Sequence, residues 1–343
     1  MKKKKKSSKR NKSTSTLLIL GMFSLGLLIG LLLSNTLFPN KISPSLLLRE
    51  SGYQYINPLI DFDNIDFIKT KEARNLERQL NNYVRAETEK NHDISKISIY
   101  YRDLNTGVWV GINEKEQFAL ASLTKVPVMI AHYKIAESNP EHLTQKFTYS
   151  TDSEDFLSYM EGIEDNRIEG YTLKEDKEYT LDDFVTQVIK YSDNTMLPFL
   201  VTDEYYDQII KTYSDLGINN PYTSEDENVV TVREYSSFFR ILYNSTYLSK
   251  EMSSKALELL SQVSFDDGLA KGIPEDVVLA NKFGERRYQT ENGNIEQLHD
   301  CGIIYHRTKP YILCIMTRGA KLDSLRRAIV NISSIVYKIV DTN

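Results

Sequence analysis

Apolar residues along this chain recur at several different spacings, and each spacing predicts a different kind of element. From about Glu72, apolar positions return every three to four residues, as on one face of an amphipathic helix. In the segment KISIYYRDLNTGVWVGIN, which begins at Lys96, apolar positions alternate on both sides of the turn sequence LNTG. Alternation around such a turn is typical of a β-hairpin, so the pattern predicts a helix followed by a hairpin.

The middle of the chain, from Ser122 to about Leu269, is predicted to be mostly helical with polar connectors. One of its helices is expected to begin after Thr180, because Asp183 follows three residues later, as in a capping box. Three strands are then predicted in the segments DVVLANKF, CGIIYHR and PYILCIMTR. The chain ends on an amphipathic helix with one apolar face, made of Leu322, Leu325, Ile329, Ile332, Val336 and Ile339.

This order of elements predicts an α/β fold of the α+β kind. Residues 71–121 and 272–343 are expected to form one five-stranded antiparallel sheet flanked by the terminal helices. Residues 122–271 are expected to form an all-helical subdomain. A cleft between the two parts is where a functional site is expected.

An uncharged segment near the N-terminus, TLLILGMFSLGLLIGLLLSNTLF, is long enough to cross the roughly 30 Å hydrocarbon core of a membrane. We therefore predict an N-terminal transmembrane helix at residues 17–38, a basic tail at residues 1–16 and a juxtamembrane linker at residues 39–70. The alternative is a cleaved signal peptide, but LSNTLFPNK lacks the small-residue pattern of a cleavage site.

The charges are divided unevenly between the tail and the remaining chain. The tail carries eight Lys and Arg and no acid, which predicts that it lies in the cytoplasm and that residues 71–343 lie outside the cell membrane. Without those eight, 34 basic residues stand against 47 acidic ones, a net charge of −13. An acidic remainder argues against nucleic acid as a partner. Next to a membrane span, topology and anionic lipid headgroups explain the basic run.

Neither the cysteines nor the histidines are spaced like metal ligands, and no metal or cofactor is expected. Two cysteines are too few for a disulfide framework in a chain of 343 residues, so buried free thiols are the default expectation. A disulfide between Cys301 and Cys314 stays open as an alternative, because a turn through Thr308 and Lys309 would bring both onto one face of adjacent strands.

Ser122 and Lys125 form an S-x-x-K pair at the start of the predicted middle region. On a helix, residues three apart lie on one face, where an amine can accept the proton of a serine nucleophile. A lone S-x-x-K is more often a helix cap followed by a surface lysine. Here Ser122 is the only serine with lysine three residues later, and the apolar run VPVM follows Lys125 directly. Poor solvation lowers the pKa of a lysine, as a base requires.

Two further segments combine residues that suit catalysis. In YSDNT, the hydroxyl of Ser192 could relay protons, Asp193 could fix the loop and the amide of Asn194 could bind a carbonyl. In NKFGE, Lys282 could bind a carboxylate and Gly284 could let a substrate backbone approach. Taken singly, the first is equally typical of a turn and the second of an exposed strand end.

Taken together and in order, S-x-x-K, S-D-N and K-x-G resemble the motifs of class A β-lactamases and penicillin-binding proteins. The resemblance, closest to the class A β-lactamase-like branch, runs from about residue 72 to the end and includes the order of elements. It implies a serine hydrolase acting through an acyl-enzyme, with Ser122 as nucleophile and Lys125 as its base or proton relay. Ser192 would pass the proton to the leaving nitrogen, and Asn194 would hold the substrate amide.

The resemblance also implies a binding role for the third motif. Lys282 would meet the substrate carboxylate, beside Gly284. The backbone N–H groups of Ser122 and Glu285 would form the oxyanion hole. His299 and Asp300 read as structural residues that brace the wall of the site.

The sequence departs from the family pattern at two places. Phe283 replaces the threonine of K-T-G, and Glu285 adds a negative side chain unless it points away. No E-x-x-L-N motif that could supply a deacylating glutamate lies between the second and third motifs; Glu225 and Glu227 are candidates by location only and read as solvated loop acids.

These departures leave three functions open. The first is a β-lactam-opening hydrolase, and the second is a D,D-peptidase acting on cell-wall stem peptides, which the missing glutamate favours. The third is a catalytically silent binding domain, against which the retention of both serines, Lys125 and Asn194 argues.

Overall fold

The computed structural model describes residues 22, 47–49, 52–62, 70–90, 92–161, 173–219, 229–290 and 293–342. Residues 1–44 and residues 45–343 form two compact units, and every element below belongs to the second unit. The predicted membrane span and basic tail lie outside the described residues, apart from Met22. None of the helices in the described ranges is both long enough and apolar enough to cross a membrane.

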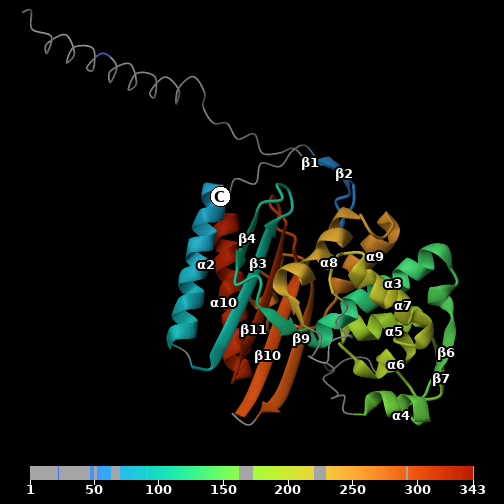
Figure 1. Cartoon of the computed structure of the whole chain (residues 1–343). Coiled ribbons are helices and arrows are strands. Elements are labelled where there is room, and N and C mark those ends of the chain that lie inside the picture. Colours follow the sequence, from blue (N-terminus) through green and yellow to red (C-terminus); the bar gives the residue numbers. More distant parts are fainter. Residues whose placement is uncertain are drawn as a thin grey trace, which may run out of the picture. The chain divides into compact units, whose positions relative to one another are not determined.

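A five-stranded antiparallel sheet forms the centre of the fold, as the sequence predicted (Figure 1). Its strand order is β4-β3-β11-β10-β9, so β9 lies at one edge. The strands are β3 (Ile94–Asp103), β4 (Trp109–Ile112), β9 (Leu279–Thr290), β10 (Gly293–Ile304) and β11 (Tyr311–Gly319). Ile99 of β3 pairs with Ile315 of β11, which joins the first and last parts of the domain.

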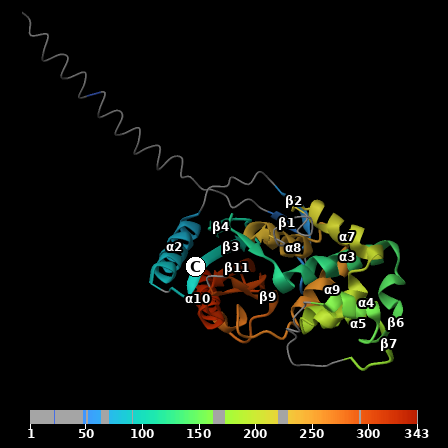
Figure 2. The same ribbon diagram turned by 60° about the horizontal axis from the view of Figure 1, so that its bottom comes forward.

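Two long helices, α2 (Lys71–Lys90) and α10 (Leu322–Asp341), cover one face of the sheet (Figure 2). Each of the two helices was predicted from its own amphipathic pattern of apolar residues. The residues that α2 buries are Ala73, Leu76, Leu80 and Val84, at helical spacing, and α10 buries the predicted face from Leu325 onward. Together with side chains such as Ile99 and Ile315 they form one apolar core.

The opposite face of the sheet carries the middle of the chain, whose side chains form the larger apolar core. Its helices are α3 (Lys125–Ser138), α4 (Glu154–Met160), α5 (Leu181–Lys190), α6 (Leu197–Leu200), α7 (Asp203–Ser214), α8 (Val232–Asn244) and α9 (Lys250–Leu260). The capping box predicted at Thr180 is confirmed, since Asp183 N–H donates to the Thr180 hydroxyl and the Asp183 carboxylate accepts from Thr180 N–H.

The expectation that this subdomain is all-helical is wrong. Strands β6 (Lys146–Tyr149) and β7 (Lys177–Thr180) pair with each other, and β5 (Gln117–Ala119) pairs with β8 (Val229–Thr231). Each strand has only three or four residues, too few for an alternating pattern to be read from the sequence. The pairing satisfies backbone groups in the connectors between helices.

Part of the segment predicted as a linker also packs against the domain. Strands β1 (Leu47–Arg49) and β2 (Leu59–Phe62) pair with each other, and Ile56 between them is buried in the larger core. The guanidinium of Arg49 donates to Asn57 O at 2.5 Å, to Asn244 Oδ1 at 2.8 Å and to Leu104 O at 2.7 Å. These two short strands are held by the hydrogen bonds of one arginine and a few backbone hydrogen bonds. Such contacts require no regular spacing of apolar residues, so the sequence shows no pattern there.

Cys301 and Cys314 form a disulfide, which corrects the expectation of free thiols. The two residues are directly paired across β10 and β11, with Cα atoms 3.9 Å apart. The turn through Thr308 sets this register, as the alternative interpretation required. On its other side Cys301 pairs with Lys282 of β9, so the disulfide lies in the row of residues that includes the third motif.

Candidate active site

Ser122 does not lie on the α-helix that the sequence predicted. It lies in a 3-10 helix, Ala121–Thr124, and α3 begins only at Lys125. Ala121 adopts a left-handed backbone conformation, with φ of 48°, and Leu123 N–H donates to Leu120 O at 2.9 Å. The hydroxyl of Tyr235 also donates to Leu123 O, at 2.9 Å. This tight turn holds the half-buried Ser122 one turn before Lys125.

Lys125 is buried, with 1% of its surface exposed, and its side-chain nitrogen points to the second motif. Its Nζ donates to Ser192 O at 2.6 Å, to Ser192 Oγ at 3.1 Å and to Asn194 Oδ1 at 2.5 Å. The apolar residues that follow it on α3 are buried, so the expectation of a poorly solvated amine is confirmed. The first and second motifs therefore meet at this side chain.

Ser192 lies in the connector between α5 and α6 and has a left-handed φ of 57°. Asp193 fixes this connector, because its Oδ1 accepts from Thr195 N–H at 2.9 Å and from the Thr195 hydroxyl at 2.7 Å. Asn194 then begins a short 3-10 helix. The positive φ brings Ser192 Oγ and its backbone O toward the same amine, an arrangement that costs of order 1 kcal/mol of backbone strain.

Lys282 reaches the same serine from the edge strand β9. Its Nζ donates to Ser192 Oγ at 3.0 Å and to Phe283 O at 3.1 Å, and the residue has 0% exposed surface. Burial, and after it the neighbouring charge of Lys125, lowers the pKa of Lys282 well below its usual value, whereas Asp300 acts in the opposite direction. The uncharged amine is therefore favoured, and the predicted contact with a substrate carboxylate stays a prediction.

Gly284 is required where β9 passes the turn that carries Ser122. A Cβ atom at this position would lie 2.9 Å from Leu120 O, closer than real Cβ atoms come, and 3.2 Å from Leu123 N, which is tighter than most real contacts. The approach of a substrate backbone thus stays a prediction, whereas Gly284 lets the chain's own backbone approach. This approach brings the backbone at Gly284 and Glu285 alongside the turn of Ser122.

The two side chains that departed from the family pattern point away from that approach. Glu285 forms an ion pair of 3.6 Å with Arg326 on α10, on the other face of the sheet. Phe283 stacks on Phe265, with ring centroids 4.1 Å apart, and Lys282 Nζ lies 4.1 Å from the centroid of the Phe283 ring. An aromatic pair therefore shields the amine of Lys282 where the family pattern has a hydroxyl.

His299 and Asp300 brace the site from β10, as the sequence suggested. His299 accepts from Thr317 N–H at 3.3 Å through Nδ1, so Nε2 donates to Ala119 O at 2.9 Å, and burial lowers its pKa to about 4. Asp300 accepts from the Asn281 side chain and from Leu269 N–H, each at 2.8 Å. Burial raises the pKa of Asp300 to about 6.

Some residues that the sequence analysis considered, and some that it missed, lie outside the hydrogen-bonded group around Ser192. Glu225 and Glu227 lie outside the described residues. Sequence reasoning missed Tyr235 and Phe265, because no local pattern links them to turns and strands far away in the chain. Within the described ranges, no group of three or more His, Cys, Asp or Glu side chains could hold a metal ion.

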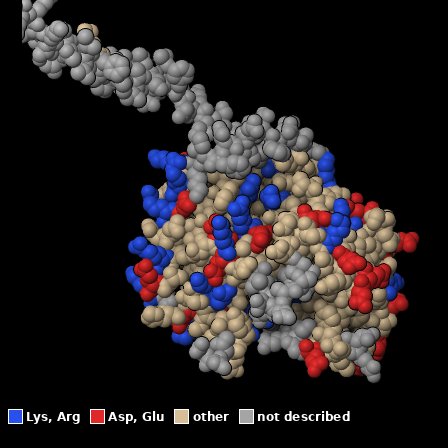
Figure 3. Space-filling view, viewed as in Figure 1, with Lys and Arg blue, Asp and Glu red and all other residues tan. Residues whose placement is uncertain are grey.

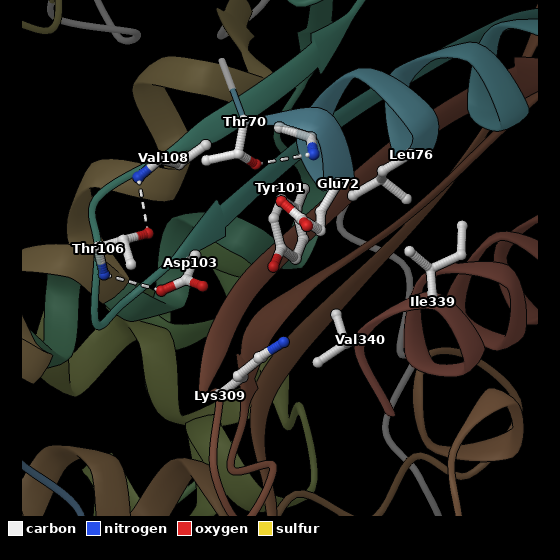
Figure 4. Close-up of a pocket in the computed structure, with 11 residues that line it drawn as sticks. Thr70, Glu72, Leu76, Tyr101, Asp103, Thr106, Val108, Lys309, Ile339 and Val340 are labelled. Carbon is white, nitrogen blue, oxygen red and sulfur yellow. Dashed lines mark hydrogen bonds between the residues drawn. The ribbon is translucent and has the colours of Figure 1, made fainter. Parts of the chain in front are cut away.

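A cavity of about 180 Å³ lies elsewhere, between the start of α2, β3 and the end of α10 (Figure 4). It is lined by residues such as Glu72, Tyr101, Lys309 and Val340, and by none of the predicted site residues. The convergence on Ser192 is therefore the better candidate for a catalytic centre. Lys125, Ser192, Asn194 and Lys282 are hydrogen-bonded there, Gly284 packs against the turn that carries Ser122, and the roles of all six residues stay predictions.

Solved structures with the same fold support this description. The structure of PBP-A is 17% identical, with a TM-score of 0.64, and covers 78% of this chain and 97% of that one. The beta-lactamase from Sphaerobacter thermophilus DSM 20745 is 20% identical, with a TM-score of 0.61, covering 77% of this chain and 97% of that one. The TLA-1 extended-spectrum beta-lactamase is 16% identical, with a TM-score of 0.64, covering 79% of this chain and 99% of that one.

No curated protein matches the chain. A family model described as the beta-lactamase enzyme family matches residues 75–340, which is most of the chain and includes all three motifs. The chain therefore belongs to the beta-lactamase enzyme family of serine hydrolases.

Proposed function

We propose that this protein is a membrane-anchored, extracytoplasmic hydrolase that opens β-lactam amides through an acyl-enzyme on Ser122. The observation that carries the proposal is the position of Ser192 Oγ, 3.1 Å from Lys125 Nζ and 3.0 Å from Lys282 Nζ. A hydroxyl held between two amines can take a proton from one side of a reaction and deliver it to the other.

The acylation step follows from this arrangement. Ser122 Oγ attacks the carbonyl carbon of the lactam, and its proton passes to Lys125 Nζ as the new C–O bond forms. The C–N bond then breaks, and the nitrogen takes the hydroxyl proton of Ser192, which is replaced from Lys125. Lys282 holds Ser192 Oγ in place during this transfer. The N–H groups of Ser122 and Glu285 would stabilise the oxyanion.

Two observations support the proposed location. The uncharged segment at residues 17–38, preceded by the basic tail, has the properties of a signal anchor with a cytoplasmic N-terminus. The Cys301–Cys314 disulfide also fits an oxidising compartment, because cytosolic thiols are kept reduced.

A D,D-peptidase acting on peptidoglycan stem peptides is the second candidate. It is favoured by the absence of an E-x-x-L-N glutamate between the second and third motifs, since an enzyme without a group to activate water is acylated by a β-lactam and then stalls. PBP-A, which shares the fold, has been solved in a mutant form as an acyl-enzyme complex with penicillin G. The two candidates share acylation and differ in deacylation.

One experiment separates these functions. The full chain, purified in detergent, is incubated with a chromogenic cephalosporin and with a fluorescent penicillin, and its intact mass is recorded over time. Rapid turnover supports the β-lactamase, and a persistent adduct supports the peptidase. Ser122→Ala must abolish either signal, while Ser138→Ala, an exposed serine at the end of α3, must leave both unchanged. Neither adduct nor turnover would overturn the proposal and leave a silent binding domain.

A further inference from the structure

Four arginines gather on one side of the domain, far along the sheet from β9. Arg102 lies on β3 next to the edge strand β4, and Arg49 lies on β1. Arg233 and Arg240 are seven residues apart on α8, so they project from the same side of that helix. We call these four residues the arginine cluster. On the face seen in Figure 3, basic side chains gather between the places that β4 and α8 occupy in Figure 1.

The positive charges of the arginine cluster act on one another. Burial lowers the pKa of Arg240, and the charges of Arg102 and Arg233 lower it further. Burial also lowers the pKa of Arg49, with Arg102 acting in the same direction. Such mutual repulsion destabilises the folded state, so the cluster needs an anion nearby to offset it.

Among the residues that the structure describes, few carboxylates lie near these charges. Across the ranges that the structure describes, none of the four arginines forms an ion pair. Asp103 raises the pKa of Arg49, but its Oδ1 accepts from the N–H groups of Asn105 and Thr106 in the hairpin turn. Beyond its tail, the chain carries a net charge of −13, so Arg102, Arg233 and Arg240 close together are an exception, whereas the guanidinium of Arg49 is already hydrogen-bonded within the fold.

Aromatic rings hold part of the cluster in place. Trp109 pairs directly with Arg102 across β3 and β4, and the guanidinium of Arg233 lies 4.7 Å from the centroid of the Trp109 ring. Tyr100 stacks on the other side of this group, with its ring centroid 5.8 Å from that of Trp109. Guanidinium groups positioned in this way bind phosphate oxygens through two parallel hydrogen bonds.

We propose that the arginine cluster docks the catalytic domain on the phosphate groups of anionic phospholipids in the membrane that residues 17–38 would cross. The proposal rests on the membrane anchor of the proposed function. Ten residues separate the predicted span from Arg49, and an extended chain of that length reaches roughly 35 Å, so the cluster is tethered within reach of the bilayer. Because the chain beyond its tail is acidic as a whole, a local gathering of arginines favours one orientation of the domain at an anionic surface.

Trp109 is the only tryptophan of the chain, so its fluorescence reports on the arginine cluster alone. The full chain is reconstituted into vesicles that contain a lipid with a nitroxide on its headgroup, with either anionic or neutral phospholipid as the bulk. We expect Trp109 emission to be quenched on anionic vesicles and not on neutral ones. The quenching should disappear in 1 M salt, where the Debye length falls to about 3 Å.

Two triple variants that lose the same number of positive charges test whether the arginine cluster is responsible for docking. The triple variant Arg102→Gln, Arg233→Gln and Arg240→Gln should dock about a hundredfold more weakly, because each basic residue contributes about 1 kcal/mol at an anionic surface. The control removes three exposed cations from other parts of the domain, by Lys146→Gln, Lys271→Gln and Arg307→Gln, and should keep the quenching.

Three results would overturn the proposal: quenching that is equal on neutral vesicles, quenching that the triple variant keeps, or Trp109 emission that shifts only with a soluble poly(glycerol phosphate). The last result would assign the cluster to a dissolved phosphodiester polymer. An alkaline carbonate wash tests the anchor separately. A chain that the wash strips off contradicts the anchor, whereas the quenching measured before the wash still decides the arginine cluster.

Discussion

Lys282 and Ser192 are joined by a hydrogen bond of 3.0 Å, although ninety residues separate them in the chain. The bond crosses from the edge strand of the sheet to a connector of the helical part. It exists because Gly284 lets β9 pass close to the turn of Ser122, which brings Lys282 within reach of the second motif. The chemistry proposed for Ser122 therefore depends on how closely the two parts of the domain pack.

Replacing Ser192 by alanine is expected to slow acylation of Ser122 by about 10² to 10⁴-fold, the usual contribution of a positioned acid or base. Both lysine amines lose their shared acceptor in this variant. The rate of adduct formation with a fluorescent penicillin, followed by intact mass, measures the effect. Ser253→Ala, at a fully buried serine of α9, is the control and should acylate at the wild-type rate. Equal rates for both variants would remove Ser192 from the mechanism.

Lys282 is expected not to tolerate arginine. Arginine stays charged at any accessible pH, whereas burial favours the neutral form of Lys282, so Lys282→Arg places an unpaired cation in the interior. We expect a loss of about 3 kcal/mol or more in the free energy of unfolding, measured by urea titration. Lys282→Met, of similar length and without charge, should unfold near the wild-type midpoint and still acylate slowly. A fully stable arginine variant would mean that water reaches this amine.

Reduction of the Cys301–Cys314 bond should destabilise the sheet. The bond closes a loop with a sequence separation of 13, and loops of this size contribute about 3 kcal/mol to the free energy of unfolding. Thermal unfolding with and without a reductant measures the loss. The double variant Cys301→Ala and Cys314→Ala should match the reduced wild type and should not respond to reductant. If that variant still responds, the effect of the reductant does not arise from this disulfide.

The stability of the domain is expected to fall as the pH falls from about 6.5 to about 4. Burial lowers the pKa of His132 and His299 to about 4, below the roughly 6.5 of an unfolded histidine, so the unfolded chain takes up these two protons first. Asp300 acts in the opposite direction, because its pKa of about 6 lies above the roughly 3.9 of an unfolded aspartate. For these three groups, two losses against one gain leave a net decrease of about 1.4 kcal/mol per pH unit, and His142, whose pKa burial also lowers, adds to the decrease.

Urea unfolding between pH 4 and pH 7 checks this balance. Asp300→Asn should make the decrease steeper, to about twice its wild-type slope, since the opposing proton is removed. His299→Gln should make it shallower. His92→Gln, at an exposed histidine, should leave the slope unchanged. A wild-type stability that rises toward pH 4 would contradict the assignment.

The sequence was most informative where one pattern was long or where residue types were specific. The period of α10 extends over five turns of helix, so its position beside the sheet followed from the apolar face alone. The three motifs indicated Ser122, Lys125, Ser192 and Lys282 together, because few other structures require such residues in that order.

Other features depended on contacts that no local pattern records. The tight turn at Ser122 is fixed by the hydroxyl of Tyr235, more than a hundred residues away. The disulfide required the register of β10 against β11, which sets Cys301 opposite Cys314. The Phe283 ring that lies against Lys282 Nζ is held by stacking on Phe265, which comes from a different part of the chain.

The pairing of β3 with β11 has a consequence for the order of events during synthesis. Ile99 leaves the ribosome more than two hundred residues before its partner Ile315, and Lys282 follows Ser122 by 160 positions. Neither the central sheet nor the complete amine and hydroxyl cluster can exist until almost the whole chain has emerged. The hydrogen bonds that join Ser192 to both lysines can therefore form only after β9 has been synthesised.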